Sequence, residues 1–473
     1  MKKIITSLLT SLTLIATCSH AALDLSLPDM NLPDMGDPPS SIMSYQEEQD
    51  LGKKLYRQLR RSQPVIDDPE LSGWIRSLGN RLVSRASGTR GNFYFLIIDK
   101  PSVNAFAMPG GVVAVHTGLI LNTESESELA AVLSHEIAHI TQRHIARMFA
   151  KSKGSAWKTG LGVLAGAVAA GQDPELGQAV ITASIASQLQ KQLNFSREAE
   201  TEADRVGIRI LAAAGFDPEG MPNFLSKLGH SPNAYQNVTE FLRSHPLSIN
   251  RVSDTRAMAK KYGNRPHKDD IDYLYAKAKL QAISRTHLRA RGLNNPHIQA
   301  YAQACQSNKM GQFNRTLQLL GNTSSKPAEA IAIATALNGL HKYEQSIHLL
   351  EAVTKNFPDQ EALIVPLAEA YLATRKNAKA WQLIRQNYVS EQSSLAFLDI
   401  RKEAAQASGN ITEALISAAE RYIHLGEYKH AQSLLQQATR GSSAIGAANG
   451  AKLQGLLNQV NQELKASQQK DKF

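Results

Sequence analysis

The string His135-Glu136-Ile137-Ala138-His139 constrains this chain more than any other feature of its sequence. It lies in a segment whose apolar residues recur at helical spacing, so the two imidazoles project from one face of a helix. Ring nitrogens on adjacent helical turns can bind one metal ion, and the intervening Glu136 can act as the base for a water molecule on that metal. The sequence therefore predicts a helix that carries the metal ligands His135 and His139 and a catalytic Glu136.

A catalytic zinc site takes three ligands from protein and one from water, so the two histidines need a partner from elsewhere in the chain. The acidic segment 198–204 offers one. Glu200 and Asp204 share one face of a predicted helix, where the first can bind the metal and the second can accept a ring N–H from a ligating histidine. Glu198 and Glu202 have the same spacing, so the residues alone leave the choice open. The alternative is that these acidic residues form only the solvent-exposed first turn of a helix and bind no metal.

Two further features concern the motif helix itself. Thr123, with Glu126 three residues later, indicates a capping box at its start. His144 follows His139 by five residues, which on a continuous helix is an offset of about 140°. We therefore expect His144 not to bind the same metal and to be a packed or capping histidine.

The region before the motif helix has β-type patterns. Residues 93–98 form one apolar run, and residues 104–108 and 112–116 form two more around the turn Pro109-Gly110-Gly111. Two apolar runs around a Pro-Gly-Gly turn predict a hairpin, and we expect a small antiparallel sheet here.

From about residue 270 the chain contains only helical patterns. A period of 34 residues relates Tyr343, Asn377 and Ile411. The same period aligns small residues where paired helices would cross, at Ser346, Ala380 and Ala414. This pattern resembles the tetratricopeptide repeat. An irregular helical array is the alternative, because most of the expected Trp and Gly positions are missing.

The first residues are typical of an exported protein. A basic start, an apolar stretch over residues 4–16 and the small-x-small triplet Ser19-His20-Ala21 predict an export signal that is cleaved after Ala21. Lipidation of Cys18 is the alternative. Residues 22–42 contain repeated Leu-Pro-Asp-Met and predict an extended linker. We expect the mature protein in the periplasm.

The net charge of +10 is unevenly distributed. Residues 251–300 contain eleven Lys or Arg against four Asp. We interpret this basic stretch as a solvated face at a domain junction, because the chain has no nucleic-acid motif and an exported protein rarely meets nucleic acid. Contact with acidic membrane lipids or with an acidic partner surface is the alternative. We interpret the small apolar residues 160–171 as a close-packed helix or a mobile lid, and contact with a membrane or a substrate is the alternative there.

The motifs described above, taken in their order along the chain, resemble those of one known protein family. His-Glu-x-x-His, followed by Glu-x-x-Ala-Asp and preceded by Asn-Ala-Phe-x-x-Pro-Gly-Gly, resembles the M48 family of zinc metallopeptidases. The resemblance covers roughly residues 43–260. It implies one Zn²⁺ per chain, with Glu200 as the third ligand and Asp204 as its companion.

The resemblance also draws attention to Ser244-His245-Pro246, which is followed by Arg251. The proline favours an extended backbone at His245. From such a loop His245 can reach the metal as a fourth ligand, or it can stabilise the oxyanion as a catalytic residue. A fourth protein ligand would displace water and silence the enzyme until the loop moves. A surface histidine is the plain alternative.

The fold class that we predict is mainly α. An α+β gluzincin-type metalloprotease domain with a small antiparallel sheet is followed by an all-α tetratricopeptide-like solenoid. The expected divisions are a signal peptide, a linker, the protease domain, the repeat domain and a polar tail, at residues 1–21, 22–42, 43–265, 266–465 and 466–473.

The expected chemistry is hydrolysis by a zinc-activated water with Glu136 as general base. We expect the substrate to lie extended along an edge strand of the small sheet, where main-chain hydrogen bonds recognise exposed backbone. We assign that strand to Gly111, Val112, Val113, Ala114 and Val115.

Within the M48 family, the signal peptide and repeat tail are similar to those of periplasmic proteases that also act as chaperones in outer-membrane β-barrel assembly. The resemblance implies unfolded or misassembled outer-membrane proteins as substrates and contact with the assembly machinery through the repeats. A chaperone or scaffold with a structural or silent metal site is the alternative.

Overall fold

The computed structural model describes residues 44–151, 195–230, 239–248, 250–285, 288–440 and 447–470. All of them belong to one compact unit of the chain. The predicted signal peptide, the linker at 22–42 and the apolar segment 160–171 lie outside the described residues. In the part that is described, no helix is both long enough and apolar enough to cross a membrane.

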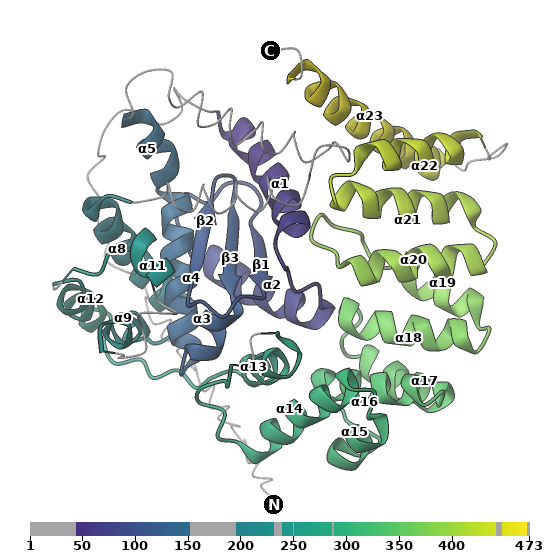
Figure 1. Cartoon of the computed structure of the whole chain (residues 1–473), viewed down its shortest axis with the longest axis horizontal. Coiled ribbons are helices and arrows are strands. Elements are labelled where there is room, and N and C mark those ends of the chain that lie inside the picture. Colours follow the sequence, from purple (N-terminus) through teal and green to yellow (C-terminus); the bar gives the residue numbers. More distant parts are fainter. Residues whose placement is uncertain are drawn as a thin grey trace, which may run out of the picture. The chain divides into compact units, whose positions relative to one another are not determined.

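The first half of the described chain surrounds a small sheet with helices (Figure 1). Its elements are α1 (Tyr45–Ser62), α2 (Pro69–Val83), β1 (Tyr94–Ile98), β2 (Ala105–Met108), β3 (Val112–His116), α3 (Thr117–Asn122), α4 (Glu126–Thr141), α5 (His144–Lys151), α8 (Arg197–Ala213), α9 (Gly220–His230), α11 (Thr239–Ser244) and α12 (Arg251–Lys260).

Side chains at the N-caps define where the two site-bearing helices begin. The Ser125 hydroxyl accepts a hydrogen bond from the Glu128 amide at the start of α4, and Ser196 does the same for Ala199 in α8. The capping box predicted at Thr123 and Glu126 is therefore wrong, because the cap of α4 is formed two residues later.

The sheet is mixed and has the strand order β1-β3-β2. The predicted hairpin is confirmed, since β2 and β3 are antiparallel with Met108 opposite Val112. However, β1 runs parallel to β3, with Tyr94 opposite Val112, so the sheet is not wholly antiparallel as expected. The physical reason is that β3 offers two hydrogen-bonding edges, and β1 pairs with the one that β2 leaves open.

This topology overturns the assignment of the edge strand. Val112, Val113, Ala114 and Val115 lie in the central strand, where neighbours on both sides use their main-chain groups. The carbonyl of Gly111 also accepts a hydrogen bond from the Tyr94 amide at 2.8 Å. None of these residues can take part in pairing with an added strand.

Helices cover both faces of the sheet. Leu55, Tyr56 and Leu59 of α1 pack on one face, together with alternate residues of all three strands. On the other face α2 packs against β1, and α4 packs against β2 and β3. The motif helix α4 is thereby held against the outer strand β2.

The turn between β2 and β3 is packed tightly against α1. Gly110 has φ = 76°, and a Cβ atom there would lie 2.2 Å from the carbonyl oxygen of Glu48. Both the positive φ and the close approach require glycine. The Pro-Gly-Gly turn therefore has a structural role in joining the hairpin to α1.

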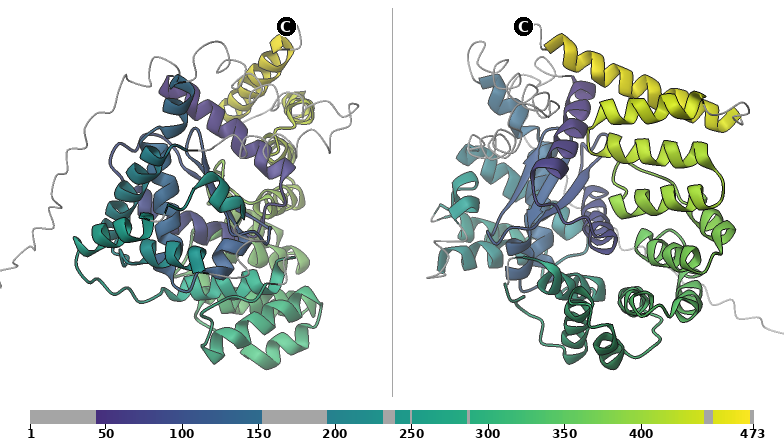
Figure 2. Two further views of the ribbon diagram at one scale, coloured as in Figure 1. Left: turned by 60° about the vertical axis from the view of Figure 1, so that its left-hand side comes forward. Right: turned by 45° about the vertical axis from the view of Figure 1, so that its right-hand side comes forward.

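The second half of the described chain is a succession of helices that Figures 1 and 2 show stacked in sequence order. They are α13 (Ile271–Ile283), α14 (Pro296–Lys309), α15 (Phe313–Leu320), α16 (Pro327–Gly339), α17 (Tyr343–Thr354), α18 (Glu361–Ala373), α19 (Asn377–Arg385), α20 (Leu395–Ala407), α21 (Ile411–His424), α22 (Tyr428–Arg440) and α23 (Ala447–Lys470).

This helical-repeat arrangement follows the predicted period. The helices α17, α19 and α21 begin at Tyr343, Asn377 and Ile411, the three positions that the 34-residue period relates. The small residues aligned by the same period, Ser346, Ala380 and Ala414, are all buried. Short side chains at these points let neighbouring helices approach closely.

Polar contacts join the two halves. Arg57 of α1 donates to a carboxylate oxygen of Glu391 at 2.9 Å and to the hydroxyl of Tyr428 at 2.7 Å. The side-chain amide of Gln392 donates to the carbonyl of Phe93 at 2.9 Å, beside β1. The helical array is therefore attached to α1 and to the β1 edge of the sheet.

Candidate metal centre

The crossing of α4 and α8 brings the sequence motifs together. At Gly207 the two helices approach so closely that a Cβ atom would lie 3.1 Å from the backbone nitrogen of His135. This contact places the first turns of α8 beside the motif residues of α4. Glu200 and Asp204 consequently face the two histidines, while Glu198 is exposed.

Three side chains converge on a common point. The Nε2 atoms of His135 and His139 lie 3.0 Å apart. Glu200 places Oε2 3.4 Å from Nε2 of His135 and Oε1 3.3 Å from Nε2 of His139. All three side chains are at most 5% exposed. Two nitrogens and a carboxylate thus meet in a buried site.

His245 joins this cluster from the residue that follows α11. Its Nδ1 lies 3.3 Å from Nε2 of His135 and 3.1 Å from Oε1 of Glu200. Its Nε2 lies 3.3 Å from a carboxylate oxygen of Glu136. The ring is buried, so His245 is not the surface residue of the plain alternative.

The donor set fits zinc. One potential ligand atom from each of His135, His139, Glu200 and His245 lies within 4.8 Å of the other three. Zinc–nitrogen and zinc–oxygen bonds of about 2.0–2.1 Å in a tetrahedron put neighbouring ligand atoms about 3.3 Å apart. Five separations among these groups, with both oxygens of Glu200 contributing, are 3.0–3.4 Å and so lie close to that edge length.

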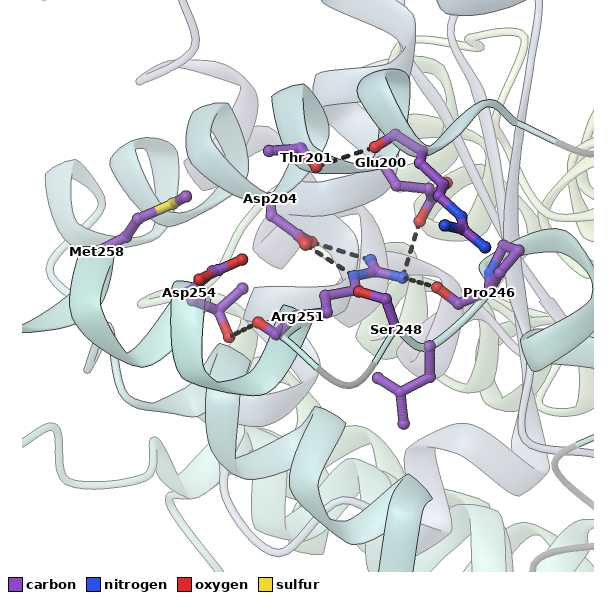
Figure 3. A pocket seen from close by; sticks show the side chains of 11 residues that line it. Glu200, Thr201, Asp204, Pro246, Ser248, Arg251, Asp254 and Met258 are labelled. Atoms are coloured by element: carbon purple, nitrogen blue, oxygen red, sulfur yellow. Dashed lines mark hydrogen bonds and ion pairs between the residues drawn. The ribbon is translucent and has the colours of Figure 1, made fainter.

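Asp204 and Arg251 form a second layer behind His135. The Nδ1 atom of His135 lies 3.0 Å from Oδ1 of Asp204. Arg251 donates to both oxygens of Asp204, at 2.7 and 2.9 Å, and its Nη1 lies 2.9 Å from Oε2 of Glu200. Figure 3 shows the guanidinium between the two carboxylates. The sequence marked Arg251 only by its place after His245, and the structure adds it to the site.

Charge pairing dominates the electrostatics of this layer. Burial opposes ionisation of Asp204, but Arg251 outweighs it and lowers the pKa of that carboxyl below its usual value. Burial also lowers the pKa of His135, yet Glu200 and Asp204 together raise it to about 9. For Glu200, the neighbouring His245 and His135 overcome burial and lower the pKa well below its usual range. The cluster therefore holds its carboxylates ionised.

A recess of about 100 Å³ borders this second layer. Glu200, Asp204, Pro246 and Arg251 contribute to its lining, as Figure 3 shows for these labelled residues. The recess lies between α8 and the segment that follows His245.

His144 lies outside the metal cluster, as the sequence argument predicts, but it is not remote from it. The chain leaves α4 after Thr141, and Arg143 adopts φ = 51° before α5 begins. This break turns His144 back, so that its Nδ1 lies 2.8 Å from Nδ1 of His139. The assumption of a continuous helix concealed this contact.

A helix-borne His-Glu-x-x-His motif, completed by a glutamate from a second helix, defines a zinc metallopeptidase. Comparison with known proteins agrees with this class. Residues 69–259 match the model of peptidase family M48. The mitochondrial metalloendopeptidase OMA1 of Arabidopsis thaliana is 34% identical over 33% of this chain and 29% of its own length.

Longer matches identify the family more closely. The beta-barrel assembly-enhancing protease of Escherichia coli (strain K12) is 32% identical, with 91% of each chain covered. The protein of the same name from Yersinia pestis is also 32% identical, over 90% of this chain and 96% of its own length. The chain therefore belongs to the beta-barrel assembly-enhancing proteases of peptidase family M48, and it is a zinc metalloendopeptidase.

Proposed function

We propose that this chain is an exported endopeptidase that acts in the assembly and quality control of outer-membrane β-barrel proteins. The convergence of His135, His139 and Glu200 beside Glu136 is the observation that carries the proposal. The relatives that match nine-tenths of the chain are named as beta-barrel assembly-enhancing proteases, and these names indicate the process. A silent metal site is less favoured, because holding a metal would not require Glu136.

We assign His135, His139 and Glu200 as the zinc ligands and Glu136 as the general base. Bound zinc supplies Lewis acidity and lowers the pKa of a water molecule to about 7. Glu136 is fully buried, and apart from the contact with His245 its carboxylate has no polar partner among the described residues. It is thus available to take a proton from the attacking water and to deliver it to the leaving amine nitrogen. Asp204, held by Arg251, keeps the ring of His135 in place.

His245 acts as a plug in the described arrangement. Its Nδ1 fills the fourth corner of the donor set, and its Nε2 lies against Glu136. Water and substrate need both of these positions. The segment after α11 must therefore move before hydrolysis, which makes the enzyme silent at rest.

We assign β2, rather than the central strand β3, as the strand with which an extended substrate pairs. Ala105–Met108 is an outer strand, it packs against α4, and none of the described residues pairs with its second edge. An extended peptide added there would run past the motif helix. Such pairing selects exposed backbone, as expected for misassembled β-barrel chains.

We also propose a cellular location and domain boundaries for the chain. We place the mature protein in the periplasm after cleavage behind Ala21, with a protease domain at 43–265 and tetratricopeptide-like repeats at 266–465. The repeats are the part that we expect to act as a chaperone and to contact the assembly machinery.

Degradation of an unfolded polypeptide such as reduced casein tests the proposed function. The Glu136→Gln variant keeps the size of the side chain but removes the base, so we expect cleavage to fall by at least about 100-fold. Zinc content should remain at one ion per chain. Removal of zinc with a chelator should abolish cleavage, and added zinc should restore it. Wild-type cleavage by Glu136→Gln would contradict the assignment.

The plug is tested by the His245→Ala variant in the same assay. We expect cleavage to increase, since the fourth position and Glu136 both become accessible to water. The neighbouring substitution Arg243→Ala, at an exposed position of α11, is the matched control. A decrease in His245→Ala at unchanged zinc content would instead assign His245 to stabilisation of the oxyanion.

A further inference from the structure

The two histidines of the motif are supported in different ways. Behind His135, the outer nitrogen Nδ1 faces Asp204, which Arg251 holds. Behind His139, the outer nitrogen Nδ1 faces Nδ1 of His144 at 2.8 Å. No carboxylate among the described residues takes the place next to His139 that Asp204 takes next to His135.

When His139 binds a metal through Nε2, the protons in this second contact have one consistent placement. His139 directs Nε2 to the metal cluster, so its proton is on Nδ1 and is donated to His144. A neutral His144 that accepts at Nδ1 carries its own proton on Nε2. That nitrogen lies 3.2 Å from a carboxylate oxygen of Glu202. A directed chain of hydrogen bonds therefore runs from His139 through His144 to Glu202.

The hydrogen-bonded chain ends at Glu202, which forms an ion pair with Arg147. Both terminal nitrogens of Arg147 lie 3.1 Å from the same oxygen of Glu202. The His144 side chain is 1% exposed, whereas those of Glu202 and Arg147 are 18% and 26% exposed. The hydrogen-bonded chain thus leads from a buried imidazole to an ion pair near the surface.

Packing also restrains the orientation of the His139 ring. The ring of Phe195 stacks on that of His139, with centroids 3.9 Å apart and an angle of 25° between the planes. Stacking restricts the plane of the imidazole, and the hydrogen bond to His144 determines which nitrogen carries the proton. Together they leave Nε2 as the atom available for a metal.

We propose that His144 and Glu202 are positioning residues for His139. By accepting the Nδ1 proton through a chain that ends on a carboxylate, they hold the ring in the tautomer that binds zinc and increase the electron density on Nε2. The inference deepens the proposed function and rests on the assignment of His139 as a zinc ligand. It gives a role to Glu202, which the spacing of the acidic segment left unexplained.

The test compares two substitutions at position 144. Asn places a side-chain oxygen near the location of Nδ1 and can accept the same proton, whereas Leu cannot. We expect the dissociation constant for zinc, measured by chelator competition, to rise about 10–100-fold in His144→Leu. The rise should be smaller in His144→Asn and in Glu202→Gln, because each keeps an acceptor for the His139 proton and loses only the link to the carboxylate at position 202. Glu198→Gln on the same helix is the matched control.

Cobalt substitution gives a second readout that does not depend on activity. The visible absorption band of the cobalt protein reports ligand geometry, so it should shift or weaken in His144→Leu and be retained in His144→Asn. Thermal unfolding of the metal-free variants identifies any general loss of folding. If His144→Leu does not fold, Glu202→Gln carries the test through the same two measurements.

Three outcomes would overturn the inference. One is wild-type zinc affinity and an unchanged cobalt band in His144→Leu. Another is an equal loss in the Asn and Leu variants, which would indicate packing rather than hydrogen bonding. The third is a wild-type protein that binds no zinc, which would refute the proposed function as well. Zinc binding by the wild type with unaffected variants would refute the positioning role alone.

Discussion

His116 is a buried histidine at the end of β3 and is not a member of the metal-site cluster. It is 1% exposed, and its Nδ1 lies 2.7 Å from the hydroxyl of Ser102. Burial, with a smaller contribution from Lys100, lowers the pKa of His116 to about 3. In the unfolded chain a histidine has a pKa of about 6.5. Between these values the unfolded state binds the extra proton, so the folded state loses stability as the pH falls.

The variant His116→Asn should reduce this sensitivity to acid, because Asn is neutral and can still accept from Ser102. Below pH 6 we expect the wild-type free energy of unfolding to fall about 1 kcal/mol per pH unit more steeply than that of the variant. Urea denaturation of both metal-free proteins at several pH values between 7 and 5 measures the difference. Parallel pH profiles would show that His116 does not titrate in this way.

Some residues of the candidate site could be predicted from the sequence, and others could not. His135, Glu136 and His139 follow from helical spacing within one element, which is a local property. The choice of Glu200 over Glu198 depends on how α8 crosses α4, and single-helix geometry contains no such information. The break at Arg143, with its positive φ, could not be read from composition either, so the contact between His144 and His139 was missed.

At the scale of elements, the crossing of α4 and α8 controls whether the proposed ligands meet. The Gly207→Val variant adds side-chain atoms where a Cβ alone would lie 3.1 Å from the His135 nitrogen. Overpacking of this kind costs about 1–3 kcal/mol of unfolding free energy. Because the strain falls on the backbone of His135, zinc affinity should decrease as well.

Gly73→Val is the matched control for this crossing. Gly73 is also helical, but nothing lies within 4 Å of an added Cβ atom. We expect its unfolding free energy to stay within about 0.5 kcal/mol of wild type. Urea denaturation and chelator competition on both variants measure the two effects. Equal stability and zinc affinity in the two variants would refute the role of the crossing.

The elements themselves were predicted where the pattern is local. The β2–β3 hairpin has a turn signal, and the starts of α17, α19 and α21 follow from the repeat period. The parallel pairing of β1 was not predicted, because every residue of the three strands is buried. A wholly apolar strand carries no alternation that would identify its neighbour.

At the scale of the whole molecule, the predicted order of a protease part followed by a helical array is confirmed. The attachment between them was beyond prediction, since Arg57 and Tyr428 are 371 positions apart and no local pattern links them. These contacts place the array on α1 and beside β1, away from the outer strand β2. A client held by the array would therefore have to reach β2 from another side of the sheet.

X-ray absorption at the zinc edge of the loaded protein tests the central claim most directly. In the wild type we predict one zinc per chain with three imidazoles and one carboxylate oxygen at about 2.0–2.1 Å. In His245→Ala the number of imidazoles should fall to two, with a water oxygen in place of the third. Fewer than two imidazoles in the wild type, or the same number in both proteins, would contradict the account.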